Sequence, residues 1–277
     1  MGKKKLRILT VSAHPHDWTW FAGTLGIHVE RGDSVTVCIA THGGSTHNEK
    51  LAAELAKPES EQDQDIINAP PDEYISQKET EMRQAASLFG VTDVRMLNYA
   101  DKPFTIARFP DCVRRIADLI LEIRPDVLIT ENPYHSGDSG LQIRHRNDHT
   151  EVGIAVMEAK DMAATPTTGG QDSSHKIAVA LYHGATFDPS AIDIFIELSD
   201  EWFEKRVQAE AFYESQGHDP VQAKRRMEID IGHTGGIART KYAEGFVREK
   251  PELRSHLPVP ELMRRQASET ALDRIAR

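Results

Sequence analysis

The stretch "RILTVSAHPHDWTWFAGTLGIHVERGDSVTVCIAT", residues 7–41, decides the fold. Residues 7–13 form a continuous β-prone run, and residues 34–41 form a second one. Between them, apolar side chains recur at helical spacing up to Gly32, a residue that suits a helix C-terminus. A strand, a helix and a second strand within about 35 residues predict a βαβ unit of a parallel sheet.

The same alternation continues along the chain. The patterns predict helices over 73–90, 111–125 and 147–163, and strands over 93–100 and 126–133. Asn147 or Asp148 is expected to cap the last of these helices. Because the strands are continuously apolar rather than alternating, both faces of the sheet should be covered. The fold class is therefore α/β, with a Rossmann-like, mostly parallel sheet flanked by helices.

The regular alternation of predicted strands and helices ends near residue 176. Two predicted strands, 176–184 and 191–199, have no full helix between them, which indicates a mixed edge of the sheet. Helices are expected over 200–216 and 219–232, followed by an irregular C-terminal segment at 242–260 that wraps the domain. We expect a single domain over residues 1–277. Its βαβ core with the metal motifs spans 1–175, and its mixed edge strands, helices and tail span 176–277.

The amino-acid composition argues against several classes of binding partner. The formal net charge is −10, which argues against binding to nucleic acid or to an anionic membrane surface. No run approaches the roughly 18 apolar residues of a membrane span. The two cysteines, Cys38 and Cys112, are too few for a disulfide framework or a cysteine-based zinc site, so we expect buried thiols. A cytoplasmic location follows from these observations.

Polar side chains gather where the first strand ends. His14, His16 and Asp17 follow the apolar run, and Pro15 favours an extended His14. Imidazole and carboxylate are ligands for zinc or a similar divalent ion, and a catalytic zinc needs about three protein ligands and an open position. His149, at the start of the helix after the fourth strand, is the candidate third ligand. The alternative is that His14 and Asp17 only cap the following helix.

Further candidates lie in loops that follow strands. Ligands bind at the carboxyl ends of parallel strands, and there His42 and His47 follow the second strand and Tyr134 the fourth. We expect these three residues to contact substrate. Asp148 is expected to act as a base or to orient a neighbouring histidine. His183 also ends a strand and could line the same opening, although a core histidine is the simpler interpretation.

The motifs "SAHPHD", "GDSVTVCIATHGG" and "NDHTEVG" resemble those of the LmbE-like or PIG-L family of zinc-dependent N-acetylglucosaminyl deacetylases. The resemblance implies that His14, Asp17 and His149 bind the metal. The family's first motif reads Ala-His-Pro-Asp-Asp, with the first aspartate as general base, and here His16 stands in that position. A neutral imidazole can take the same proton, since its unperturbed pKa is near 6.5.

A second departure precedes His149. Many members of the family carry a histidine three residues before this ligand, where this chain has Arg146, with His145 one residue earlier. Either side chain could stabilise a developing oxyanion.

The resemblance implies a metal-dependent hydrolase, with zinc or another divalent ion, that removes an acetyl or other acyl group from the nitrogen of an amino-sugar-like small molecule. It also favours a homo-oligomer. The alternative is a metal-dependent hydratase of an unsaturated oxo-carboxylic acid, in which Arg144 and Arg146 bind carboxylates. A third hypothesis is a binding module whose altered motif has lost catalysis.

Overall fold

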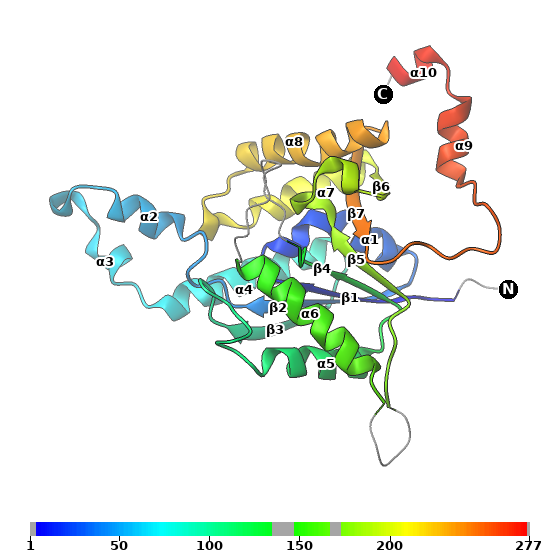
Figure 1. Ribbon diagram of the computed structural model, residues 1–277. Coiled ribbons are helices and arrows are strands. Elements are labelled where there is room, and N and C mark those ends of the chain that lie inside the picture. Colours follow the sequence, from blue (N-terminus) through cyan, green and yellow to red (C-terminus); the bar gives the residue numbers. More distant parts are fainter. Residues whose placement is uncertain (1–3, 135–146, 167–172, 276–277) are drawn as a thin grey trace.

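The computed structural model describes residues 4–134, 147–166 and 173–275. Its strands form one seven-stranded sheet in the order β3-β2-β1-β4-β5-β7-β6 (Figure 1). The strands are β1 Arg7–Ser12, β2 Ser34–Thr41, β3 Asp93–Tyr99, β4 Val127–Thr130, β5 Val179–His183, β6 Ile194–Leu198 and β7 Tyr242–Arg248. β1 to β5 are mutually parallel, whereas β7 runs antiparallel to both β5 and β6. The predicted mostly parallel α/β sheet is confirmed.

Helices cover both faces of the sheet (Figure 1). The α-helices are α1 Ala22–Glu30, α2 Glu49–Leu55, α3 Gln64–Ile67, α4 Pro71–Leu88, α5 Cys112–Ile123, α6 Asp148–Ala164, α7 Asp200–Ala211, α8 Pro220–Ala238, α9 Glu261–Ser268 and α10 Ala271–Ile275. Short 3-10 helices are η1 Asp17–Phe21, η2 Glu59–Glu61, η3 Gly184–Thr186, η4 Pro189–Ala191 and η5 Glu214–Gln216. Of the helices in these described ranges, none is long and apolar enough to cross a membrane.

Alternate residues of β1 pack into two separate hydrophobic cores, one on each face of the sheet. Ile8 packs with buried residues of α1, α4, α7 and α8 on one face. Leu9 and Val11 pack with buried residues of α5 and α6 on the other face. Cys38 and Cys112 belong to this second core as buried free thiols, as predicted. The continuously apolar central strands are therefore explained by burial on both sides.

The C-terminal segment departs from the sequence-based expectation. Residues 242–248, predicted to be irregular, form β7 and lie inside the sheet between β5 and β6. Ala243 and Phe246 on this strand are buried, but a glutamate and a glycine between them hide the β pattern in the sequence. The helix predicted at 219–232 also continues to Ala238. Beyond β7, the chain is irregular from 249 to 260 and then forms α9 and α10.

Glu244 explains how a charged residue fits the middle of β7. Its carboxylate is buried and forms an ion pair with the buried Arg206 of α7, at 2.6 Å. It also accepts hydrogen bonds from the backbone N–H groups of Gly23 (3.0 Å) and Thr24 (2.7 Å) in the first turn of α1. A negative charge is favourable at a helix N-terminus. One side chain thus joins the late strand to α1, which directly follows the turn of His14 and Asp17.

We predict that Glu244→Gln lowers the free energy of unfolding by about 3 kcal/mol, because it leaves the charge of Arg206 buried without its partner. Urea unfolding followed by circular dichroism measures this change. Glu228→Gln on the exposed side of α8 is the control and should change stability by less than about 0.5 kcal/mol. Equal unfolding curves for the two variants would contradict the assigned role of Glu244.

Candidate metal centre

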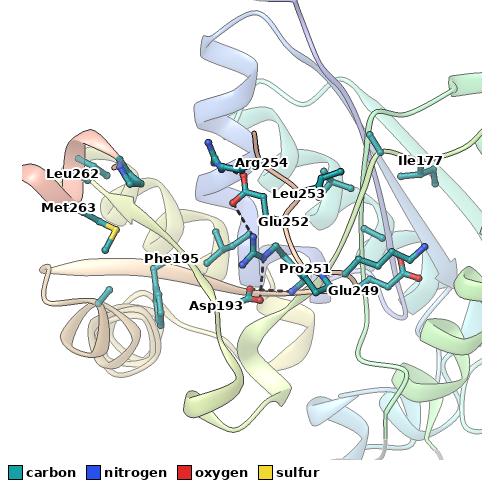
Figure 2. Close-up of a pocket in the computed structure, with 18 of the residues that line it drawn as sticks. Ile177, Asp193, Phe195, Glu249, Pro251, Glu252, Leu253, Arg254, Leu262 and Met263 are labelled. Carbon is teal, nitrogen blue, oxygen red and sulfur yellow. Dashed lines mark hydrogen bonds and ion pairs between the residues drawn. The ribbon is translucent and has the colours of Figure 1, made fainter. Parts of the chain in front are cut away.

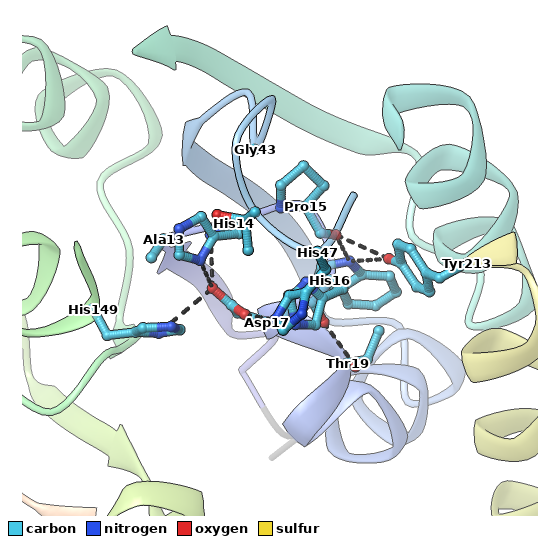
Figure 3. Close-up of polar contacts among 12 residues, drawn as sticks. Ala13, His14, Pro15, His16, Asp17, Thr19, Gly43, His47, His149 and Tyr213 are labelled. Carbon is cyan, nitrogen blue, oxygen red and sulfur yellow. Dashed lines mark hydrogen bonds and ion pairs between the residues drawn. The ribbon is translucent and has the colours of Figure 1, made fainter. Parts of the chain in front are cut away.

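Three side chains from two distant segments meet at the carboxyl ends of the parallel strands. β1 pairs in parallel with β4, so the turn after β1 and the helix after β4 start from the same edge of the sheet. His14, Asp17 and His149 each offer a ligand atom, and these atoms all lie within 4.8 Å of one another (Figure 3). Both rings also approach the Asp17 carboxylate: Asp17 Oδ2 lies 3.1 Å from His14 Nδ1 and 3.6 Å from His149 Nδ1, the nitrogen that also faces Glu131.

The turn after β1 is held by hydrogen bonds. Asp17 Oδ2 accepts a hydrogen bond from the backbone N–H of His14 at 2.7 Å. The carbonyl oxygen of Pro15 accepts from the Tyr213 hydroxyl (2.9 Å) and from Trp18 Nε1 (3.1 Å) (Figure 3). The N-cap residues of η1 and α1 are His16 and Phe21, and neither side chain accepts a hydrogen bond from its helix. The geometry therefore disfavours the alternative in which His14 and Asp17 serve only as helix caps.

A close contact of α6 brings His149 to this turn. Asn147 caps the helix by accepting from the Thr150 N–H at 3.0 Å, as predicted. Gly153 lies one turn after His149 on the same side of the helix. A Cβ atom at Gly153 would come within 2.9 Å of the carbonyl oxygen of Glu131, directly after β4. The missing side chain lets the helix pack onto the end of β4, which places His149 beside Asp17.

Asp148 orients His14. Its Oδ2 lies 3.1 Å from His14 Nε2, and its carboxylate also accepts from the backbone N–H groups of Lys102 (3.0 Å) and Phe104 (2.8 Å). Although burial opposes ionisation, these hydrogen bonds lower the pKa of Asp148 to about 2. Both carboxylate oxygens of Asp148 are therefore engaged by these contacts. Of the two roles predicted for Asp148, the contacts favour orienting a histidine over acting as a base.

His16 lies against the Asp17 carboxylate, on the side away from His14. Its Nε2 is 3.2 Å from Asp17 Oδ1, and its buried Nδ1 has no hydrogen-bond partner among the described residues. Burial lowers the pKa of His16 to about 3 despite the nearby Asp17. The imidazole is therefore neutral at pH 7.

The loop after β2 places His47 next to His16. The two rings meet edge to face with centroids 5.3 Å apart, and about half of the His47 side chain is exposed. His47 has a φ of 52°, which is uncommon for a residue other than glycine. The Tyr74 hydroxyl donates to the His47 carbonyl oxygen at 2.7 Å, and the buried Lys78 Nζ donates to the carbonyl oxygens of Gly43 (2.8 Å) and Thr46. Two side chains of α4 thus fix this loop.

The other two predicted substrate residues lie differently. His42 Nδ1 accepts from the Gly44 N–H at 3.0 Å and lies 3.7 Å from Asp101, so this ring faces its own loop. Tyr134 is 57% exposed and packs edge to face on the buried Tyr182. Arg144, His145 and Arg146, predicted to bind substrate or an oxyanion, lie outside the described residues.

The sequence pattern did not predict Glu131 as a residue of the site, and it favoured a purely structural role for His183. Glu131 is fully buried directly after β4, and its Oε2 lies 3.2 Å from His149 Nδ1 and 2.6 Å from His183 Nε2. Burial opposes ionisation, but His183 and His149 together lower the pKa of Glu131 to about 2. The position of Glu131 at a strand end was the available signal, the same one that identified His14. His183 is indeed buried, yet it belongs to the surroundings of the metal centre.

The residues fit a divalent cation. Two imidazoles and one carboxylate are a donor set typical of catalytic zinc. Asp17 Oδ1 is buried and accepts no hydrogen bond within the described part of the chain, although His16 Nε2 lies 3.2 Å away. Burial alone lowers the pKa of His149, but the carboxylates of Asp17 and Glu131 raise it to about 10. The two carboxylates therefore favour positive charge at the position where the three ligand atoms converge.

A separate hollow lies at the other end of the strands. It measures about 1400 Å³ and lies between the starts of β5 and β6, the end of β7 and the segment leading to α9 (Figure 2). Several of its charged side chains pair with one another, as Arg248 does with Asp193 (3.3 Å) and Glu252 (3.1 Å). The three candidate ligands do not line it. We therefore assign the chemistry to the metal centre rather than to this hollow.

Solved structures share the fold. N,N'-diacetylchitobiose deacetylase from Pyrococcus horikoshii aligns with a TM-score of 0.68 at 18% identity, covering 89% of this chain and 84% of the deacetylase. GalB, the 4-carboxy-2-hydroxymuconate hydratase from Pseudomonas putida KT2440, aligns with a TM-score of 0.68 at 20% identity, covering 91% of this chain and 99% of the hydratase.

Sequence comparison is more specific. The probable N-acetyl-alpha-D-glucosaminyl L-malate deacetylase 2 of Bacillus anthracis is 24% identical over 239 residues, which cover 86% of this chain and 91% of that protein. The family model described as PIG-L, GlcNAc-PI de-N-acetylase, matches residues 9–160. This match spans more than half of the chain and contains His14, Asp17 and His149. The chain therefore belongs to the PIG-L family of de-N-acetylases.

Proposed function

We propose that this protein is a metal-dependent hydrolase that removes an acetyl group from the nitrogen of an amino-sugar-like small molecule. The observation that carries the proposal is the convergence of His14, Asp17 and His149, whose ligand atoms lie within 4.8 Å of one another. Family membership and the deacetylase names of the relatives support the reaction type. A bound zinc or similar ion supplies Lewis acidity, which polarises the acyl carbonyl and makes water a stronger acid.

The chain's own residues then handle the proton. Hydrolysis adds water to the amide carbonyl carbon and breaks the C–N bond, giving acetate and an amine. We assign to the neutral imidazole of His16 the role of taking the proton of the attacking water and later returning it to the leaving nitrogen. Asp17 lies against Nε2 of His16, at 3.2 Å, and stabilises the imidazolium that forms.

Substrate contacts come from the rim of the site. His47 is half exposed beside His16, and we assign it a hydrogen bond to the substrate. Tyr134, exposed and supported by Tyr182, offers a flat surface for the substrate. The buried free thiols of Cys38 and Cys112 support a cytoplasmic location, where thiols stay reduced.

We expect His14→Ala and Asp17→Ala to lose the bound metal while the fold persists, because each removes one of three ligands. Elemental analysis after dialysis should find about one zinc per wild-type chain and little in either variant. His28→Ala is the control, since His28 forms a comparable pair with Asp33 (2.7 Å) on another part of the chain. Zinc retained by either ligand variant at the wild-type level would show that the ligand assignment is wrong.

We expect His16→Ala to keep its zinc and to lose about 100-fold or more in kcat, the usual contribution of a general base. Steady-state rates and metal content are measured on the same preparation. Asp148→Asn should instead weaken metal retention, because Asp148 acts on the ligand His14. Wild-type turnover in His16→Ala would remove His16 from the mechanism.

The reaction type is tested on two classes of substrate. With N-acetylglucosaminyl compounds, the zinc-loaded protein should release acetate and free amine in equal amounts. Conjugated oxo-carboxylic acids should keep their ultraviolet absorbance. Loss of that absorbance without acetate release would identify a hydratase, and turnover of neither class would favour a binding module.

A further inference from the structure

Glu131 occupies an unusual environment for a carboxylate. It lies directly after β4 with no exposed surface. One oxygen, Oε1, accepts from the backbone N–H of Ala13 at 3.1 Å. The other, Oε2, meets His149 Nδ1 at 3.2 Å and His183 Nε2 at 2.6 Å. Burying an ionised carboxylate is costly unless it is paired and hydrogen-bonded, so these contacts account for its presence there.

The hydrogen-bond pattern assigns the protons. An ionised carboxylate only accepts hydrogen bonds, so the two imidazole nitrogens that face Glu131 both carry hydrogen. In a neutral His149, protonation of Nδ1 leaves the lone pair on Nε2. The other candidate histidine ligand has the same arrangement, since Asp148 Oδ2 lies 3.1 Å from His14 Nε2. Each imidazole of the proposed ligand set therefore has one buried carboxylate against one of its nitrogens.

We propose that Glu131 is a positioning residue that fixes the ring and tautomer of His149, and that His183 in turn holds Glu131. This inference rests on the proposed metal centre. Glu131 is not itself a member of the converging ligand set among the described residues. It acts through His149, and its negative charge makes that imidazole a stronger ligand.

His183 is built into the core, so it can hold Glu131 rigidly. It ends β5, is 2% exposed, and packs beside Phe21 with ring centroids 5.9 Å apart. Glu131 thus has two fixed hydrogen-bond donors, from the end of β1 (Ala13) and the end of β5 (His183), and one from the ligand that it orients. Adjacent strands on both sides of β4 determine where its carboxylate lies.

Zinc affinity, measured by competition with a chromophoric chelator on the full chain, tests the proposal. We expect Glu131→Gln to bind zinc about 10- to 100-fold more weakly, the usual effect of removing such a partner. His183→Phe should weaken binding similarly, whereas His183→Gln, which keeps a donor, should recover most of the affinity. Adding His183→Phe to Glu131→Gln should cause little further loss, because the two residues act as one unit.

A matched control separates this role from general destabilisation. Glu210 is another buried carboxylate paired with an imidazole, His218 at 3.2 Å, and with Arg226 at 2.6 Å. Glu210→Gln should lower the melting temperature without changing zinc affinity. Unchanged affinity in Glu131→Gln would overturn the proposal. A loss as complete as that of Asp17→Ala would overturn it too, because Glu131 would then be a ligand.

Nitrogen-15 NMR of the histidine rings gives a readout independent of affinity. In the zinc-loaded protein, the His149 signals, identified by their loss in His149→Gln, should show hydrogen on Nδ1 and metal on Nε2. Metal on Nδ1 would contradict the proposal. If zinc still binds to Asp17→Ala, the metal centre itself is wrong. If only the Glu131 and His183 variants behave as wild type, this inference alone fails.

Discussion

The parallel pairing of β1 with β4 is the constraint on which the rest of the structure depends. It brings residues more than 130 positions apart to one edge of the sheet. The contact of α6 with the end of β4 at Gly153 then sets the height of His149 above that edge. Hydrogen bonds from Trp18 and Tyr213 also fix the turn after β1, so contacts outside the candidate centre hold both of its halves in place.

Three buried carboxylates surround the position to which the sheet topology brings the histidines. Asp17, Glu131 and Asp148 are all buried, and imidazoles lie against each of them. Burial opposes their ionisation, yet the neighbouring imidazoles keep the pKa of each below its usual range. Such a group of buried carboxylates favours a cation among them, in line with the proposed divalent ion. The same carboxylates contact His14 and His149 and thereby orient both rings.

Much of this arrangement could be predicted from the sequence. The apolar runs predicted β1 to β5 and their helices, because strands buried on both faces leave a clear pattern. Because ligands bind at the carboxyl ends of parallel strands, the sequence also predicted that His14, Asp17 and His149 come together. β7 could not be predicted this way, because Glu244 and Gly245 interrupt its pattern. The ion pair with Arg206 and the hydrogen bonds from α1 make the glutamate acceptable in the sheet.

Other parts depend on contacts that spacing does not encode. The sequence offers Glu131 as one polar residue among several after β4, and its role emerges only when His149 and His183 are seen beside it. Lys78 and Tyr74 lie in a helix whose pattern predicts only amphipathic packing, yet they fix the loop of His47. His42 and His47 look equivalent in the sequence, but only His47 is directed towards His16.

The central claim is that a single divalent ion binds where these two segments meet. Anomalous diffraction at the zinc absorption edge, on crystals of the zinc-loaded protein, tests it most directly. The account predicts one strong peak within coordination distance of the side chains of residues 14, 17 and 149. A zinc-loaded crystal with its peak elsewhere, or with these side chains turned away from any ion, would contradict it.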